Sequence, residues 1–275
     1  MQFPQPAPDT INAVQMSVII PVLNEACLLA DFLADIRRLV PAAEIIVVDG
    51  GSDDGTCEVA IPLADKVVRT PAGRGRQMNA GAALARGEIL WFLHADSRIP
   101  ANAVESMAEA LADPGTAGGC FSLKIVLPRW VFRARDAMGN VCVDLFGIAL
   151  GDRGLFCRRS AFVAAGGYTT APLFEDANLY KELGRAGTTR RVTSTIQTSA
   201  RRYEAQGPVR TCLFYGLIML LYWIGLPKRL LEEFVFRLFP RRKPVEAKAS
   251  GRAPQTDAID RALPPSIPLQ SKSNV

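Results

Sequence analysis

Residues 44–56 read EIIVVDGGSDDGT, a run of apolar and β-branched residues followed directly by a glycine-rich acidic loop. The run shows no alternation of apolar and polar side chains, so it predicts a strand buried on both faces of a sheet. A similar run, MSVIIP, covers residues 16–21. Strands of this kind are typical of α/β proteins, in which helices cover both faces of a mostly parallel sheet.

Helical patterns separate these strands. Residues 24–40 have apolar side chains at helical spacing and Pro41 after them, which predicts an amphipathic helix. A strand at 66–69, a helix at 76–86 and a strand at 88–93 continue the alternation. In the second half we expect strands at 121–126, 154–159 and 190–197, and helices at 130–146 and 175–186. Ligands bind beyond the carboxyl ends of parallel strands, so Pro21, Asp49 and Asp96 should converge on one rim.

Composition limits the class of protein. The chain has 275 residues, 49% of them hydrophobic, and a formal net charge of +5, enough for one large domain or two small ones. The basic balance suits phosphorylated substrates or anionic lipid. Nucleic acid is the weakest partner because no RNA-recognition motif, zinc finger or basic-region helix occurs. The cysteines form no Cys-x-x-Cys pair, which indicates a reducing compartment, and Cys27, Cys120 and Cys157 are expected to be buried thiols.

The chain is expected to hold one folded domain at residues 16–240, between a flexible N-terminus (1–15) and a disordered tail (241–275). The domain divides into residues 16–117, 118–205 and 206–240. Residues 211–226 are apolar and uncharged, but shorter than the ~20 residues of a membrane span. They predict a buried helix or an interfacial helix with basic flanks. We therefore expect a cytoplasmic protein, with the inner face of the membrane as a possible location for this segment.

Two further segments carry candidate chemistry. Residues 73–81, GRGRQMNAG, place glycines and arginines at a helix start, where backbone donors, helix dipole and guanidinium groups favour an anion. His94 and Asp96 follow an apolar strand, and residues i and i+2 of a strand face the same way. An imidazole and a carboxylate so placed can hold a divalent cation between diphosphate oxygens. The alternative is a histidine bonded to nearby backbone and an aspartate that begins a turn.

In this order, residues 21–25 (PVLNE), 47–56 (VVDGGSDDGT), 73–81 and 92–96 (FLHAD) resemble the family 2 glycosyltransferases of GT-A fold. The resemblance covers about residues 16–230, and it is closest to the radical-SAM/selenodomain-associated transferase 2 subgroup. It implies an α/β fold of the nucleotide-diphospho-sugar transferase type. It also implies inverting transfer of a sugar from a UDP- or GDP-type donor to an unidentified acceptor, with Mg²⁺ or Mn²⁺.

The resemblance also assigns residues. Asp96 would be the metal-binding carboxylate of an Asp-x-Asp motif whose first aspartate is replaced here by His94, which would contact a ribose hydroxyl, a metal-bound water or the metal itself. The other donor-site residues would surround the nucleoside or lie beside the phosphates: Pro21, Glu25, Asp49, Gly51, Asp54, Arg76 and Asn79.

The second half would supply the base and the acceptor side. Glu175 and Asp176 resemble the family's acidic pair at a helix start. We assign the base that takes the acceptor proton to Asp176, with Glu175 as the second choice. Simple helix capping is the alternative. By the same resemblance, Asp152 lies on the acceptor side, although a glycine turn explains residues 151–154 equally well, and Arg201 or Arg202 reaches the diphosphate.

Two other functions remain open from the sequence. A nucleotidyltransferase of related fold would carry its glycine-rich arginine loop directly after the first strand, whereas here that loop comes about fifty residues later. A non-catalytic, membrane-associated binding protein would explain residues 211–226 and the basic tail, but it leaves the polar motifs at the strand ends without a role.

Overall fold

The computed structural model describes residues 16–125, 130–150, 152–170 and 174–198, together with 214, 216–218, 221, 230 and 231. These residues belong to one compact unit that ends at Glu232.

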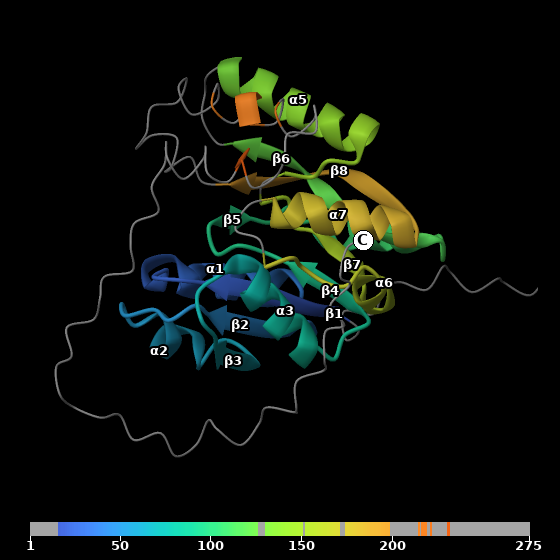
Figure 1. Ribbon diagram of the computed structural model, residues 1–275. Helices are drawn as coiled ribbons and strands as arrows, with labels where there is room; N and C mark the ends of the chain where they lie inside the picture. Colours follow the sequence, from blue (N-terminus) through green and yellow to red (C-terminus); the bar gives the residue numbers. More distant parts are fainter. Residues whose placement is uncertain are drawn as a thin grey trace, which may run out of the picture. The chain divides into compact units, whose positions relative to one another are not determined.

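One mixed sheet forms the centre of the described region, with the strand order β3-β2-β1-β4-β7-β6-β8-β5 (Figure 1). Strands β1 to β4 pair in parallel, as do β6 and β8, whereas β7 runs antiparallel to both β4 and β6, and β5 antiparallel to β8. The strands are β1 Met16–Val22, β2 Glu44–Asp49, β3 Lys66–Arg69, β4 Ile89–Phe92, β5 Ser97–Arg98, β6 Thr116–Ile125, β7 Phe156–Arg158 and β8 Thr188–Thr198.

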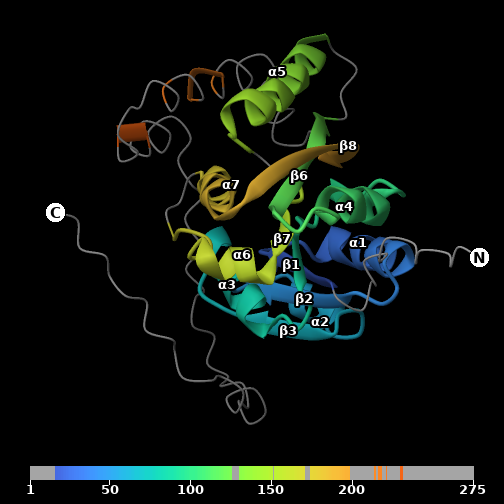
Figure 2. The ribbon, with the colours of Figure 1, turned by 90° about the vertical axis from the view of Figure 1, so that its right-hand side faces the viewer.

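Helices cover both faces of this sheet. Helices α1 and α4 lie on one side, and α3, α6 and α7 on the other, while α5 packs beside β6 and β8 (Figure 2). The helices are α1 Ala26–Leu39, α2 Thr56–Ala60, α3 Arg74–Leu84, α4 Ala103–Leu111, α5 Trp130–Phe146, α6 Arg159–Ala164 and α7 Glu175–Ala186.

Alternate side chains of β1 enter two separate cores. Val18 and Ile20 pack with Phe32 and other α1 residues, whereas Ile19, between them, packs with Met78 of α3. This alternation follows from the two-residue repeat of a strand. The strand is buried on both faces, as its uninterrupted apolar sequence predicted.

Most predicted elements are confirmed, including the helices at 130–146 and 175–186. Sequence reasoning missed α4, α6 and the short strand β5. The prediction for Cys27 was wrong: its side chain is exposed on the outer face of α1, whereas Cys120 and Cys157 are buried. Cys27 is exposed because it lies outside the core-facing stripe of α1. That stripe consists of Leu29, Phe32, Leu33 and Ile36.

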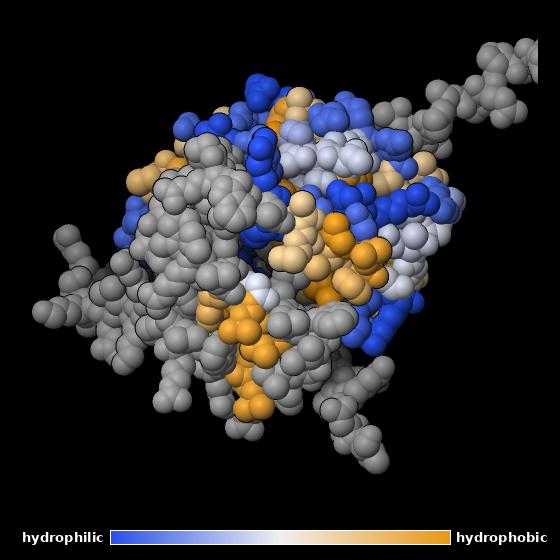
Figure 3. Space-filling view, turned by 90° about the horizontal axis from the view of Figure 1, so that it is seen from above, coloured by the Kyte–Doolittle hydropathy of each residue, from blue (hydrophilic) through white to orange (hydrophobic). Residues whose placement is uncertain are grey.

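Helix α5 presents an apolar stripe. Met138, Val141 and Leu145 are 57%, 48% and 70% exposed. The view of the molecule from above shows apolar side chains among polar ones on this face (Figure 3). Within the described ranges, none of the helices combines the length and apolarity needed to cross a membrane. Most of residues 211–226 lie outside those ranges, so the membrane role predicted for them stays a prediction.

Glu44 joins the amino ends of the strands at the edge opposite the predicted rim. Its buried carboxylate accepts hydrogen bonds from the Ser17 hydroxyl (2.6 Å) and the Arg86 amide (2.7 Å), and it pairs with Lys66 (2.9 Å). The Ser17 hydroxyl also accepts a bond from the Gly87 amide. Burial raises the pKa of Glu44, but these partners outweigh it and hold the pKa at about 2.

We expect Glu44→Gln to lower the free energy of unfolding at pH 7 by about 3 kcal/mol, the equivalent of the depressed pKa. A depressed carboxyl pKa stabilises the fold above the unfolded-state value of 4.5, and this contribution is lost as the pH falls from 4.5 towards about 2. The difference between variant and wild type, measured by urea unfolding, should therefore shrink over that interval. Asp35→Asn, which changes an exposed carboxylate, is the control, and a pH-independent difference for Glu44→Gln would contradict the account.

Candidate active site

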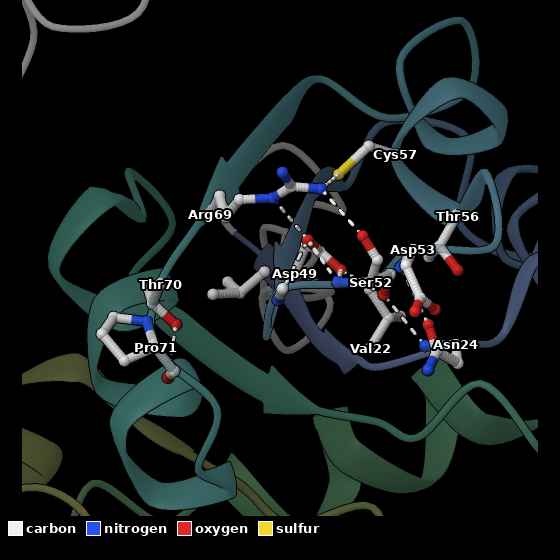
Figure 4. A network of polar contacts seen from close by, with 12 residues as sticks. Val22, Asn24, Asp49, Ser52, Asp53, Thr56, Cys57, Arg69, Thr70 and Pro71 are labelled. Atoms are coloured by element: carbon white, nitrogen blue, oxygen red, sulfur yellow. Dashed lines mark hydrogen bonds and ion pairs between the residues drawn. The ribbon is translucent and has the colours of Figure 1, made fainter. Parts of the chain in front are cut away.

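The loop after β2 is built around Asp49 (Figure 4). The Asp49 side chain is fully buried and accepts hydrogen bonds from the amides of Gly51 and Ser52, both at 3.1 Å, from the Ser52 hydroxyl, and from Arg69 Nε at 2.8 Å. Burial raises the pKa of Asp49, but the bonds from Ser52 and Arg69 outweigh it and lower the pKa below its usual value. Asp49 therefore orders the loop as a buried anion, and its predicted contact with the nucleoside stays a prediction.

The loops after β1 and β2 are tied to each other. The Asn24 amide donates to the Ser52 hydroxyl (2.9 Å), and Asn24 Oδ1 accepts from the Asp53 amide (3.0 Å). Asp54 accepts from the Ala26 amide at the start of α1 (3.1 Å). Asn24 adopts a left-handed backbone with φ of 57°, which asparagine tolerates better than most residues.

The residues predicted to surround the nucleoside lie on these two loops or beside them. Pro21 is buried in β1 opposite Val48, and Glu25 is half-buried at the start of α1. Gly51 and Asp54 are exposed. These positions agree with a shared rim at the carboxyl ends of β1 and β2, although only the exposed members offer surface to a ligand.

Gln77 clamps the two strands together below this rim. Its side chain is 3% exposed, and its Nε2 donates to the carbonyl oxygens of Val22 (2.9 Å) and Val48 (2.8 Å). Its Oε1 accepts from the Gly73 amide at 3.3 Å. Sequence reasoning gave Gln77 no role. The signal that could have found it is a polar glutamine near the start of a helix that packs against the ends of two buried strands.

The first turn of α3 is fixed against residues 166–170. Asn79 Nδ2 donates to the Tyr168 carbonyl and Asn79 Oδ1 accepts from the Tyr168 amide, each at 2.8 Å. A Cβ atom on Gly75 would lie 2.2 Å from the Thr169 carbonyl oxygen, so only glycine permits this approach. Asn79 was predicted to lie beside the phosphates. In the structure both polar atoms of its amide are bonded to the Tyr168 backbone, so it positions the loop before α7, and its place beside the phosphates stays a prediction.

A histidine and two carboxylates meet behind this rim. His94, Asp152 and Asp176 each offer a ligand atom, and these atoms lie within 4.8 Å of one another. His94 Nε2 lies 3.2 Å from Asp152 Oδ1, and the His94 side chain is 10% exposed. His94 follows β4, Asp152 precedes β7, and Asp176 lies in the first turn of α7. Ligands from three separate elements therefore converge on one point.

The structure groups His94 with residues that the sequence did not pair with it, while metal binding by Asp96 stays a prediction. Strand β4 ends at Phe92, and residues 93–96 form a loop and a turn, so strand alternation does not govern their side chains. The cluster contains Asp152 and Asp176 with His94, whereas Asp96 lies outside it but near enough to act on Arg74.

Arg74 is the cation of this site. Its Nη1 lies 3.5 Å from Asp152 Oδ1. The negative charge of Asp152, followed by Glu175, Asp176 and Asp96, raises the pKa of Arg74 above its usual value. Sequence reasoning chose Arg76, whose side chain is exposed. Helix α3 begins at Arg74 instead of residue 76, and Arg74 is the arginine that lies beside Asp152, while the role of Arg76 beside the phosphates stays a prediction.

Asp176 has a strongly perturbed carboxyl group. Burial raises its pKa well above the usual value, as do the neighbouring carboxylates Glu175 and Asp152, while the positive charge of Arg74 partly offsets the rise. Phe174, directly before α7, has a φ of 61°, an uncommon backbone conformation for a bulky residue. Perturbed carboxyl groups and strained backbone gather at functional sites, which favours a functional role for Asp176 over helix capping alone.

Residues 152–154 direct two charged side chains to different places. Asp152 faces the cluster, whereas Arg153, 3% exposed, donates to the Leu150 carbonyl (3.0 Å) and to Asn140 Oδ1 (2.8 Å). Gly154 has a φ of 57°, and a Cβ atom there would lie 2.3 Å from Ile196 Cδ1. This turn is therefore shaped by the core and points Asp152 outward. The predicted contributions of Arg201 and Arg202 lie outside the described residues.

Residues 17–142 match the model of glycosyl transferase family 2. The match covers just under half of the chain, and this segment is therefore similar to a family 2 glycosyltransferase domain. Solved structures of similar fold include a mannosyltransferase from Pyrobaculum calidifontis in complex with GDP-Man and Mn²⁺, with a TM-score of 0.51 and 22% identity. That alignment covers 66% of this chain and 56% of the mannosyltransferase chain, so this chain spans just over half of that relative.

A second group of similar structures is glucosyl-3-phosphoglycerate synthase from Mycobacterium tuberculosis. Its complex with Mn²⁺, UDP and glucosyl-3-phosphoglycerate gives a TM-score of 0.56 at 20% identity, over 82% of this chain and 87% of that one. At these identities the likeness establishes the fold. The predicted GT-A fold of the glycosyltransferase is confirmed.

We expect Gln77→Leu to lower the free energy of unfolding by about 2 kcal/mol or more, because the carbonyls of Val22 and Val48 would lose a buried donor. Urea unfolding measures the loss, and hydrogen exchange of the loop amides at residues 50–52 should speed up. Arg76→Ala, an exposed change on the same helix, should stay within about 0.5 kcal/mol of wild type. Equal stabilities for the two variants would refute the clamp.

Proposed function

We propose that this glycosyltransferase moves a sugar from a UDP- or GDP-type nucleotide diphosphate to an acceptor hydroxyl, with inversion at the anomeric carbon. One observation carries the proposal: His94, Asp152 and Asp176 converge within 4.8 Å in a family 2 domain. Arg74 lies at the same point, and the rim loops follow β1 and β2. Motif resemblance places the chain near the radical-SAM/selenodomain-associated transferase 2 subgroup, and we propose that membership as well.

The cluster suits a divalent cation. Four carboxyl groups lie near enough to Arg74 to raise its pKa: Asp152, Glu175, Asp176 and Asp96. The acidic groups here therefore outnumber the arginine. Carboxylate oxygens suit Mg²⁺ and Mn²⁺, and a neutral imidazole is a common ligand of transition-metal ions. His94 and Asp152 would hold the ion, with Asp176 or Asp96 completing the protein ligands. When bound, such an ion supplies positive charge that stabilises the departing diphosphate.

Asp176 is our candidate for the general base. A carboxylate of raised pKa accepts a proton from an acceptor hydroxyl more readily near neutral pH than an ordinary one does. Its place in the first turn of α7 directs it into the site, where Tyr168 and Arg74 interact with it. Glu175, its neighbour, is the second choice. In this proposal Asp176 takes the proton as the acceptor oxygen forms its bond to the anomeric carbon and the nucleotide diphosphate leaves.

The test of the function is release of nucleotide diphosphate from a panel of UDP- and GDP-sugars in the presence of Mn²⁺. Wild type should release it from at least one donor, and Asp176→Asn should lower the rate by about 10² to 10⁴, the usual contribution of a general base. Release of pyrophosphate from a nucleoside triphosphate instead would indicate a nucleotidyltransferase.

Mn²⁺ binding separates the two possible roles of Asp176. If it is the base, Asp176→Asn should bind Mn²⁺ and donor much as wild type does, whereas Asp152→Asn should lose Mn²⁺. If both variants lose Mn²⁺ equally, Asp176 is a ligand and the base must be sought at Glu175. Full activity in Asp176→Asn would remove it from the mechanism.

His94 should set the preference of the site for one cation over another. Mg²⁺ takes oxygen ligands, so replacing the imidazole by an oxygen ligand favours Mg²⁺ over Mn²⁺. We expect His94→Asp to raise the Mg²⁺-to-Mn²⁺ affinity ratio roughly tenfold, the effect of about 1.4 kcal/mol, measured by calorimetric titration. His94→Asn, a neutral oxygen ligand, controls for the added charge, and an unchanged ratio in both variants would place His94 outside the ligand set.

A further inference from the structure

We propose that Arg74 competes with the cation for Asp152 and is released to the donor diphosphate, so that donor binding raises the affinity for the cation. The inference rests on the proposed function, because it concerns the same site. It adds a device that couples the two ligands and a positioning role for an arginine that the sequence motif did not single out.

The competition follows from a shared atom. Asp152 Oδ1 lies 3.2 Å from His94 Nε2 and 3.5 Å from Arg74 Nη1. His94 and Asp152 belong to the group of ligand atoms that lie within 4.8 Å of one another. A cation bound by that oxygen would therefore meet the positive guanidinium at close range. Like charges so near each other weaken both interactions, so one must move away.

Arg74 is the partner that can move. Its side chain is 42% exposed, whereas that of Asp152 is 19% exposed and that of His94 10% exposed. The backbone of this helix start is fixed, because the Asn79 side chain bonds both the amide and the carbonyl of Tyr168. Gly75 also packs closely against the Thr169 carbonyl. A flexible side chain on an anchored helix start can leave Asp152 without any change in the fold.

The released guanidinium has a natural acceptor in a diphosphate. Arg74 is the first residue of α3, where backbone amides and the helix dipole favour an anion, and a guanidinium binds phosphate oxygens through paired hydrogen bonds. Without a cation, Arg74 is the nearby positive charge on which Asp152, Glu175, Asp176 and Asp96 act. With cation and donor bound, the same arginine would stabilise the phosphates.

The experiment is calorimetric titration of Mn²⁺ into wild type and Arg74→Gln, first with the metal alone and then with saturating UDP or GDP, whichever wild type binds. Without the competing charge, Arg74→Gln should bind Mn²⁺ alone about tenfold more tightly. It should bind the nucleotide, at saturating Mn²⁺, about tenfold more weakly. The nucleotide should raise Mn²⁺ affinity more in wild type than in this variant, and by linkage Mn²⁺ should raise nucleotide affinity by the same factor.

Two further variants make the result specific. Arg74→Lys keeps the charge and should resemble wild type in Mn²⁺ affinity, which also guards against a folding defect in Arg74→Gln. Arg76→Gln removes the same charge from the same helical turn but leaves the Arg74–Asp152 ion pair in place, and should change Mn²⁺ affinity less than Arg74→Gln does.

The outcomes separate this inference from the proposed function. If wild type binds Mn²⁺ and nucleotide but Arg74→Gln binds Mn²⁺ no more tightly than wild type, the competition is refuted and the proposed function stands. If wild type binds neither ligand, both are refuted. An equal gain in Mn²⁺ affinity for Arg74→Gln and Arg76→Gln would reduce the effect to net charge and also overturn the inference.

Discussion

The close approach of Asp152, Asp176 and His94 is the constraint on which the site depends. Carboxylates this near to each other repel when both are charged, and burial adds to the cost. The structure meets this cost with Arg74 beside Asp152 and with a raised pKa at Asp176. A bound cation would replace Arg74 in this role, because carboxylate oxygens and an imidazole are suitable ligands for Mg²⁺ or Mn²⁺.

The fold holds this cluster from several directions at once. Asp49 and Gln77 order the loops at the ends of β1 and β2, while Asn79 and Gly75 fix the start of α3 against the segment before α7. The antiparallel strand β7 lies between β4 and β6, so the turn that carries Asp152 comes next to the loop that carries His94. Each ligand thus belongs to a different element, and the sheet sets the distance between them.

The sequence predicted those parts of the fold that local patterns encode. Uninterrupted apolar runs located β1 and β2, and the helices expected at 130–146 and 175–186 match α5 and α7 to the residue. His94 could be named because it follows an apolar strand, and Asp176 because it resembles the family's acidic pair at a helix start. Their meeting with Asp152 could not be derived, because it depends on how β7 joins the sheet. Arg74 was passed over because the family resemblance pointed to Arg76, and Asp96 was paired with His94 because strand alternation was extended beyond Phe92.

The central claim is that this cluster is a cation site that serves a nucleotide diphosphate. Anomalous diffraction from crystals grown with Mn²⁺ and UDP or GDP tests it directly. The account predicts an anomalous peak within coordination distance of Asp152 and His94, with nucleotide phosphate oxygens as further ligands. A peak at another group of residues, or a bound nucleotide with no anomalous peak beside Asp152, would contradict it.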